Sequence, residues 1–168
     1  MERRKATENT DREIVIKRVF NSPCKTLWKA WSDPEVLKRW WAPEGCTTPF
    51  CHVEFRVGGK LHYCMRMADG KDIWGLGIYR EIIPHVRLVF TDSFADEKGN
   101  LVAPSHYGMS EDLGLETVVT VIFRESGGKT ELTLKQTVNR SVPEREGMME
   151  GWSQMFNRLA RELEAIRS

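Results

Sequence analysis

The stretch FNSPCKTLWKAWSDPEVLKRWWAPEG, residues 20–45, predicts the end of a strand followed by two short helices. Each helix would begin at a polar residue followed by proline, Ser22-Pro23 and Asp33-Pro34, because such a side chain can cap the first turn and proline fits its first position. The segment APEG ends the second helix. The residues expected to point inward are Cys24, Leu27, Trp28 and Trp31 in the first helix and Val36, Leu37, Trp40 and Trp41 in the second.

Segments rich in β-branched and aromatic residues lie on both sides of this stretch and predict an antiparallel sheet. Short turns, of which Ser126-Gly127-Gly128 is the clearest, separate most of them, and strands joined by short turns are antiparallel neighbours. The predicted strands are 12–20, 48–57, 60–67, 73–83, 86–94, 116–125 and 130–138.

The last element is predicted to be one long helix, from about residue 142 to residue 167. Ser141 and Glu144 have the spacing of a capping box. Apolar residues recur at intervals of three and four, which predicts a single buried stripe that lies on the concave face of the sheet. The stripe consists of Met148, Trp152, Met155, Leu159 and Leu163. The predicted fold class is therefore α+β, with a curved sheet of six or seven strands around this helix.

Length and charge limit the class of protein. A chain of 168 residues fits one domain, predicted over residues 12–168 after a flexible arm over residues 1–11. The 25 basic and 24 acidic side chains leave a net charge of +1, which gives no long-range attraction toward nucleic acid. No segment approaches the roughly 20 apolar residues of a membrane span, and no secretory signal is present. We therefore expect a cytoplasmic protein with reduced thiols and no membrane insertion.

The order of these elements, together with four motifs, resembles the START-like (SRPBCC) helix-grip superfamily. The group in question is related to the C-terminal domain of the activator of the ninety-kilodalton heat-shock chaperone ATPase. The motifs are FNSPCKTLWKAWSDPEVLKRWWAPEG (20–45), FRVGGKLHYCMRMADG (55–70), GIYREIIPHVRLVFTDSF (77–94) and EGWSQMFNRLARELE (150–164), and the loop 95–109 is similar to that of a bacterial and archaeal branch. The resemblance implies a helix-grip fold. Members of this superfamily bind lipids, polyketides, hormones or chaperones, and some catalyse cyclisation or hydroxylation.

The cysteine pair near the tryptophans does not predict a metal site. Cys46 and Cys51-His52 are spaced more loosely than zinc ligands, and a second ligand pair is missing from the sequence. If residues 51 and 52 belong to a strand, their side chains point to opposite faces. We expect the thiols to pack as small apolar groups and the protein to hold no metal or cofactor.

The adjacent Trp40 and Trp41 would point about 100 degrees apart on a helix, so that one can anchor the core while the other faces a cavity. The alternative is that both are core residues. Gly147 and Gly151 share one face of the last helix, which indicates either a close approach of its backbone to the sheet or side-chain volume withheld beneath it.

Two further segments carry candidate binding residues. Strand 60–67 alternates polar and apolar residues, which places His62 and Arg66 on the solvent face, or in a cavity if the sheet curvature turns that face inward. Loop 95–115 is long enough to be a lid and contains His106 and Tyr107, although it can equally be a solvated loop.

The leading hypothesis is non-catalytic binding of a small apolar or amphipathic molecule between the sheet and the last helix, by a monomer or homodimer. The candidate ligand-binding residues are Trp40, Trp41, His62, Arg66, Trp74, His106, Tyr107, Met148, Trp152, Met155 and Phe156. No nucleophile elbow or phosphate loop occurs, and no catalytic residue is assigned. The alternatives are a chaperone-associated or stress-response module that binds a protein partner through its outer sheet face, and a polyketide-cyclase-like enzyme.

Overall fold

Seven antiparallel strands form one sheet in the order β1-β7-β6-β5-β4-β3-β2, in a computed structural model that describes residues 11–167. The strands are β1 (Glu13–Phe20), β2 (Thr47–Val53), β3 (Lys60–Arg66), β4 (Asp72–Ile83), β5 (Arg87–Ala95), β6 (Thr117–Ser126) and β7 (Lys129–Thr137). The helices are α1 (Cys24–Ser32), α2 (Pro34–Leu37) and α3 (Arg145–Arg167), with short 3-10 turns η2 (Pro104–Tyr107) and η3 (Glu111–Leu113). The first ten residues of the predicted N-terminal arm lie outside the described residues.

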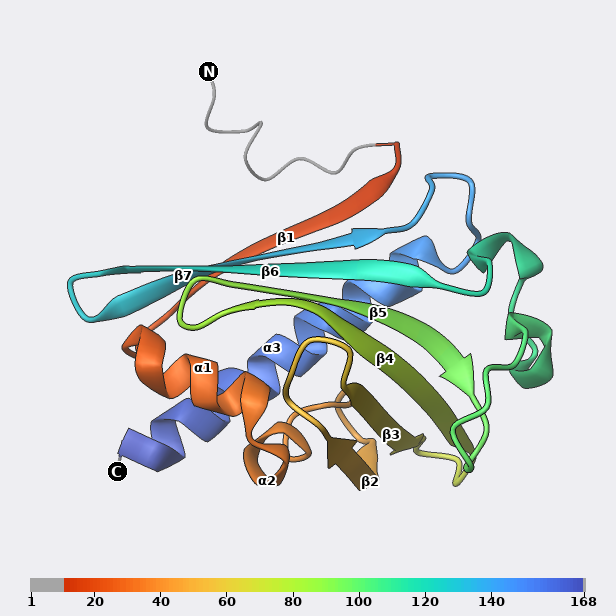
Figure 1. Cartoon of the computed structure of the whole chain (residues 1–168), viewed down its shortest axis with the longest axis horizontal. Coiled ribbons are helices and arrows are strands. Elements are labelled where there is room, and N and C mark those ends of the chain that lie inside the picture. Colours follow the sequence, from red (N-terminus) through yellow and green to blue (C-terminus); the bar gives the residue numbers. More distant parts are fainter. Residues whose placement is uncertain (1–10, 168) are drawn as a thin grey trace.

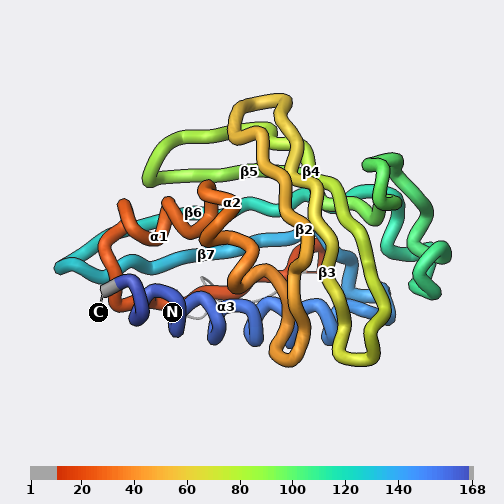
Figure 2. Tube along the Cα trace, turned by 90° about the horizontal axis from the view of Figure 1, so that it is seen from below, coloured from red at the N-terminus to blue at the C-terminus, as the bar shows by residue number. Residues whose placement is uncertain are grey.

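The sheet curves around α3, which crosses one face of it (Figure 1). The same arrangement is visible from below in Figure 2, where α3 runs along one side of the strands. β1 pairs with β7 along its whole length, from Glu13 opposite Thr137 to Phe20 opposite Thr130, so the first and last strands are neighbours. This arrangement confirms the predicted α+β helix-grip architecture.

Aromatic side chains pack one end of the structure, where α1 and α2 meet the C-terminal half of α3. The ring of Trp31 lies 4.8 Å from Trp40 and 6.4 Å from both Phe123 and Phe156, measured between centroids. The indole N–H of Trp40 donates to the carbonyl of Ala30 at 3.0 Å. Trp40 is therefore a core residue, which agrees with both sequence alternatives, since they differ only in whether its neighbour faces a cavity.

The predicted cap of α1 is wrong, whereas the predicted cap of α2 is confirmed. The Ser22 hydroxyl makes no capping bond to α1; instead Glu125 of β6 accepts the Cys24 backbone N–H at 2.8 Å. Because that partner is 101 residues away in the chain, no local pattern could indicate it. In α2, the Asp33 carboxylate accepts the Glu35 N–H at 2.9 Å, as predicted.

The predicted capping box of the last helix is also wrong. α3 begins at Arg145 rather than at residue 142, and the Glu144 carboxylate accepts the backbone N–H of Ser110 at 2.7 Å. The side chain of Glu144 thus joins the start of α3 to the loop that follows β5. No described helix is long and apolar enough to cross a bilayer.

Candidate functional site

A cavity of about 440 Å³ lies between the sheet and the N-terminal half of α3. Its walls come from the inner face of β3, β5, β6 and β7, from the loop after η2, and from the residues that follow α2. The lining consists of Trp41, Pro43, Tyr63, Met65, Met67, Asp92, Ser93, Phe94, Met109, Leu113, Gly114, Leu115, Glu116, Thr117, Gln136, Pro143, Glu144, Gly147, Met148, Gly151, Trp152 and Met155.

The two glycines of α3 leave this space open. A Cβ atom at Gly147 would meet nothing within 4 Å, and one at Gly151 would meet only Pro43, at 4.0 Å. A close approach of the backbone to the sheet, one of the two sequence alternatives, is therefore wrong. The glycines instead withhold side-chain volume beneath the helix.

Aromatic rings form the deep wall of the cavity. Trp41 lies 5.6 Å from Trp152 and 5.6 Å from Tyr63, in both cases edge to face. Trp31 stacks behind Trp152 at 6.3 Å and connects this wall to the packed core. The Tyr63 ring fits because its cross-strand partner is Gly75, where a Cβ would come within 2.2 Å of that ring.

A chain of hydrogen bonds crosses the sheet side of the cavity. The Trp152 indole N–H donates to Gln136 Oε1 at 2.8 Å, and Gln136 Nε2 donates to Thr117 Oγ1 at 2.9 Å. The Thr117 hydroxyl in turn donates to the carbonyl of Asp92 at 3.3 Å. These bonds fix the Trp152 ring and leave few rotamers open to it.

Asp92 is a half-buried carboxylate in the cavity wall, and Tyr63 donates its hydroxyl to Asp92 Oδ1 at 2.7 Å. Burial raises the pKa of Asp92 to about 6, although the bond from Tyr63 acts in the opposite direction. Burial, and then the neighbouring carboxylate, raises the pKa of Tyr63 above its usual value, so the phenol stays protonated.

The indole N–H of Trp41 is a buried donor without a partner. Trp41 is 1% exposed, and its N–H lies near the Tyr63 hydroxyl without reaching hydrogen-bond geometry. A buried donor left unpaired costs about 1–3 kcal/mol. A ligand acceptor in the cavity could recover part of this cost.

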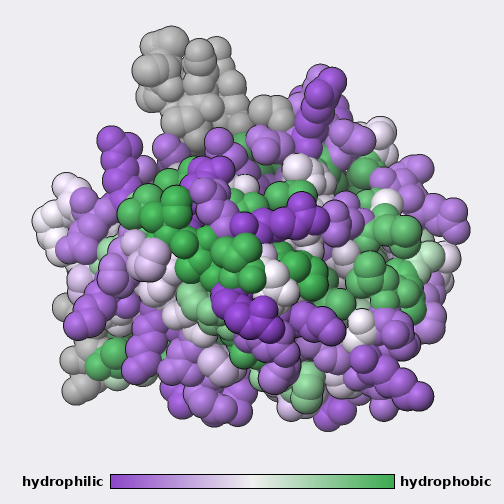
Figure 3. Space-filling view, in the orientation of Figure 1, coloured by the Kyte–Doolittle hydropathy of each residue, from purple (hydrophilic) through white to green (hydrophobic). Residues whose placement is uncertain are grey.

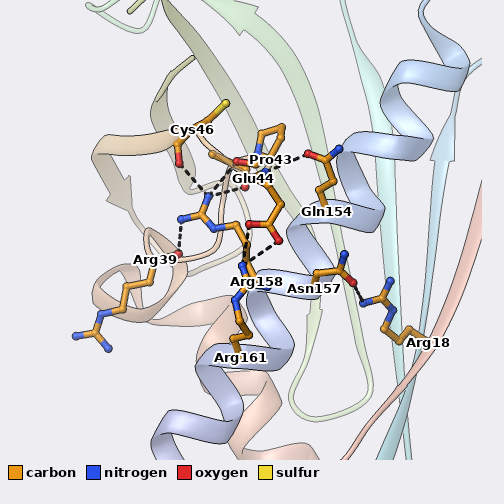
Figure 4. A network of polar contacts seen from close by, with 10 residues as sticks. Arg18, Arg39, Pro43, Glu44, Cys46, Gln154, Asn157, Arg158 and Arg161 are labelled. Atoms are coloured by element: carbon orange, nitrogen blue, oxygen red, sulfur yellow. Dashed lines mark hydrogen bonds and ion pairs between the residues drawn. The ribbon is translucent and has the colours of Figure 1, made fainter. Parts of the chain in front are cut away.

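The C-terminal half of α3 is attached firmly to the segment after α2 (Figure 4). The guanidinium of Arg158 donates to the backbone carbonyls of Arg39 at 2.8 Å, Ala42 at 2.6 Å and Cys46 at 3.1 Å, and more weakly to that of Pro43 at 3.3 Å. These carbonyls lie on both sides of Trp41 in the chain, one of them before it and three after it. Arg158 therefore fixes the position of the segment that carries one cavity wall.

Further contacts of the same helix strengthen this attachment. Arg161 Nη2 donates to both carboxylate oxygens of Glu44, at 2.7 and 2.9 Å, and the Glu44 N–H donates to Gln154 Oε1 at 3.1 Å. On the other side of α3, Asn157 accepts a bond from Arg18 of β1 at 2.8 Å. We call the contacts of Gln154, Asn157, Arg158 and Arg161 the anchor of α3.

The structure brings some of the candidate ligand-binding residues together and separates others. Trp41, Met148, Trp152 and Met155 line the cavity, whereas Trp40 and Phe156 are core residues beside it.

His62, Arg66 and Trp74 lie on the opposite, outer face of the sheet. His62 and Trp74 form an aromatic cluster with Phe50, with centroids 5.2 to 5.4 Å apart, which we call the outer aromatic cluster. Arg66 pairs with Asp72 at 2.8 Å. The polar–apolar alternation of strand 60–67 predicted that His62 and Arg66 lie on the solvent face. The alternative, that sheet curvature turns this face toward a cavity, is wrong.

Loop 95–115 contributes to the cavity through its second half only. Met109 and the residues from Leu113 onward line the space. Tyr107 instead donates to the Ala95 carbonyl and accepts the Trp74 N–H at 3.2 Å, and the exposed His106 contacts the Tyr107 ring edge to face.

The segment 46–52, whose cysteines and histidine raise the question of a metal site, follows α2 and is contacted by the anchor of α3. Cys46 accepts a bond from the anchor, and His52 is exposed beside Glu54 at 3.3 Å. Across residues 11–167, no three His, Cys, Asp or Glu side chains are grouped so that they could hold a metal ion.

Sequence reasoning missed the polar residues of the cavity. Each continues an apolar alternation on its strand: Asp92 follows Leu88 and Phe90, and Gln136 follows Leu132 and Leu134. Thr117 similarly precedes the buried Val119 and Val121. A polar residue at an inward register of a strand is the signal that could have found them.

Comparison with known proteins places the fold in a family. The model for "Activator of Hsp90 ATPase homolog 1-like protein" matches residues 21–164. A protein from Arthrobacter aurescens, solved by NMR, is 30% identical with a TM-score of 0.77, over 92% of this chain and 87% of that one. A crystal structure from Nitrosomonas europaea is 20% identical, with a TM-score of 0.77 over 95% of this chain and 99% of that one.

A third similar structure is the AHSA1 protein from Silicibacter pomeroyi, 23% identical, with a TM-score of 0.69 over 93% of this chain and 99% of that one. No curated protein sequence matches the chain. Because the family model spans most of the sequence, the chain belongs to the Activator of Hsp90 ATPase homolog 1-like family.

Proposed function

We propose that the protein binds a small apolar or amphipathic molecule in the cavity between the sheet and α3, without catalysing a reaction on it. The observation that carries the proposal is the open space beneath Gly147 and Gly151. Its volume of about 440 Å³ is within the usual range of small-molecule sites, about 300–1,000 Å³.

The lining supports this assignment. Apolar and aromatic side chains, five of them methionines, provide most of it, and a few polar groups such as Asp92 and Gln136 are held in place. A ligand that buries roughly 200 Å² of apolar surface gains about 5 kcal/mol before the ordering costs are subtracted.

The cyclase-like alternative receives less support. The two histidines among the candidate residues, His62 and His106, do not line the cavity and so could not act as a general acid or base in it. A general base must lie within hydrogen-bond reach of the proton that it removes. Binding therefore accounts for the cavity with fewer assumptions.

The fluorescent neutral probe N-phenyl-1-naphthylamine tests the proposal. We expect its emission to rise on binding, and we expect Gly151→Leu, which fills the cavity, to weaken binding at least tenfold. Ala165→Leu is the matched control because residue 165 is exposed on the same helix, away from the cavity. Absence of binding, or equal binding by both variants, would refute the proposal.

A second candidate function is docking of a protein partner, such as the chaperone for which the family is named. The observation that favours it is the outer aromatic cluster, in which Phe50 is 41% exposed. Figure 3 shows that apolar side chains gather in several groups on the face seen in Figure 1, separated by polar ones.

Phe50→Ser separates the two functions. It should abolish binding of the purified ninety-kilodalton chaperone in a titration if the outer aromatic cluster docks it, and leave the affinity for the naphthylamine probe unchanged. An unchanged chaperone affinity would remove this second candidate.

A further inference from the structure

The charged side chains of the cavity are all of one sign. Asp92, Glu116 and Glu144 line it, and no lysine, arginine or histidine is among the lining residues. A cavity that admits amphipathic molecules without preference for the head group would have no reason to exclude basic side chains.

Asp92 is half-buried in the cavity wall. Its known partner is the neutral hydroxyl of Tyr63, at 2.7 Å, and no ion pair to it occurs within residues 11–167. A carboxylate can accept about four hydrogen bonds, so most of its capacity is unused. With a pKa of about 6, it is about nine-tenths or more ionised above pH 7, where its charge is costly to bury uncompensated.

Glu144 adds a second unsatisfied acceptor. Its Oε2 accepts the Ser110 N–H, whereas its Oε1 is buried without a partner. Glu116 differs, since it is exposed and lies 3.6 Å from Arg80, so its charge is partly neutralised from outside.

The remaining walls suit a cation as well. The rings of Trp41, Tyr63 and Trp152 surround the same space, and an ammonium group over an aromatic face gains about 0.5–2 kcal/mol. The unpaired N–H of Trp41 calls for an acceptor, such as a hydroxyl or ether oxygen, elsewhere on the ligand.

We infer that the cavity selects amphipathic molecules whose polar end is a protonated amine, and discriminates against acids with the same apolar body. The inference rests on the proposed function and names its ligand class. Asp92 and Glu144 receive the ammonium group, while the methionine and tryptophan walls enclose the apolar part. A carboxylate ligand would instead face buried charges of its own sign.

Three probes with one naphthyl body test this selectivity: 2-(1-naphthyl)ethylamine, 2-(1-naphthyl)ethanol and 1-naphthylacetate. In calorimetric titrations at pH 7.5, we expect the amine to bind at least tenfold more tightly than the alcohol, and the acid at least tenfold more weakly. If the alcohol or the acid binds as tightly as the amine, the inference is overturned while the proposed function stands. If none of these probes and no N-phenyl-1-naphthylamine binds, the proposed function itself fails.

Variants locate the selectivity. Asp92→Asn should remove most of the amine preference, measured as the ratio of the amine affinity to the alcohol affinity, and a cooperative unfolding transition shows that the variant is folded. Glu144→Gln should reduce the preference by a smaller factor. The control, Glu97→Gln, changes an exposed carboxylate outside the cavity and should have no effect. A full amine preference in both cavity variants would overturn the assignment.

Discussion

The two halves of α3 have opposite surroundings. Phe156, Leu159 and Leu163 in the C-terminal half are at most 3% exposed and packed on all sides, and the anchor fastens the same half to the segment after α2. In the N-terminal half, Gly147 and Gly151 face open space. The helix is thus held at one end so that its other end can border a cavity. The packed turns stabilise the fold, and the proposed binding site lies along the other turns of the same helix.

Truncation of one apolar side chain in each half gives the largest expected contrast. Phe156→Ala should lower the free energy of unfolding by about 3–5 kcal/mol, because it opens a cavity in the packed half. Met148→Ala should cost about 1 kcal/mol or less, because Met148 is half-buried and already borders empty space. Urea unfolding measures both, and equal costs would contradict the division of the helix.

The anchor is expected to have the next largest effect. Arg158→Ala should cost about 2–3 kcal/mol, because several backbone carbonyls lose a charged donor. Arg161→Ala, which breaks an exposed ion pair, should cost about 0.2–1 kcal/mol. If Arg161→Ala were the more damaging change in thermal unfolding, the bonds from Arg158 to the backbone carbonyls would not be the strongest part of the anchor.

Asp92→Asn should stabilise the protein above pH 7 by about 1–2 kcal/mol. The native pKa of Asp92, about 6, is above its ordinary value of 3.8, so the native state binds this proton more tightly than the unfolded state. The resulting stability is fully present below about pH 4 and is lost as the pH rises through about 6. Partial access from the cavity makes the effect smaller than the full shift implies.

Unfolding curves of the two proteins from pH 3.5 to pH 8 check this dependence. The difference in the free energy of unfolding between the parent protein and Asp92→Asn should be absent near pH 3.5 and grow between pH 4 and pH 6. A variant less stable than the parent at pH 8 would show that the Asp92 charge stabilises the fold.

The smallest effect is expected at the glycines. Gly147→Ala should raise the free energy of unfolding by up to about 1 kcal/mol, since alanine favours the helix and its Cβ meets nothing. Chemical denaturation can resolve this change. A loss of stability would mean that the backbone at Gly147 needs the freedom of glycine.

Most of the fold could be predicted from the periodicity of apolar residues and from the turn and capping residues between the elements. The strand runs, the Asp33-Pro34 start and the apolar stripe of the last helix are local signals, and the structure confirms the elements that they predict. The Ser22 cap failed because the distant Glu125 accepts the Cys24 N–H instead, and the Ser141 capping box failed because the Glu144 carboxylate bonds to the distant Ser110 N–H.

The cavity could be predicted only in part. Helical spacing in the last helix placed Met148 and Trp152 beside the space. It did not decide between Trp40 and Trp41, and Trp41, which lines the cavity, lies beyond the end of α2. Tyr107 was misplaced because nothing local indicates that its hydroxyl bonds to Ala95. Asp92 was overlooked, although its register on an apolar strand face was readable, because a lone carboxylate in a strand is usually taken as exposed.

The most direct test of the central claim, that the N-terminal half of α3 leaves a space open to a ligand, is an NMR titration of the tryptophan indole N–H signals with N-phenyl-1-naphthylamine. The account predicts large shifts for Trp41 and Trp152, which line the cavity, and small ones for Trp40, whose N–H is bonded to Ala30 in the core. Unchanged signals of Trp41 and Trp152 at saturating probe would contradict it.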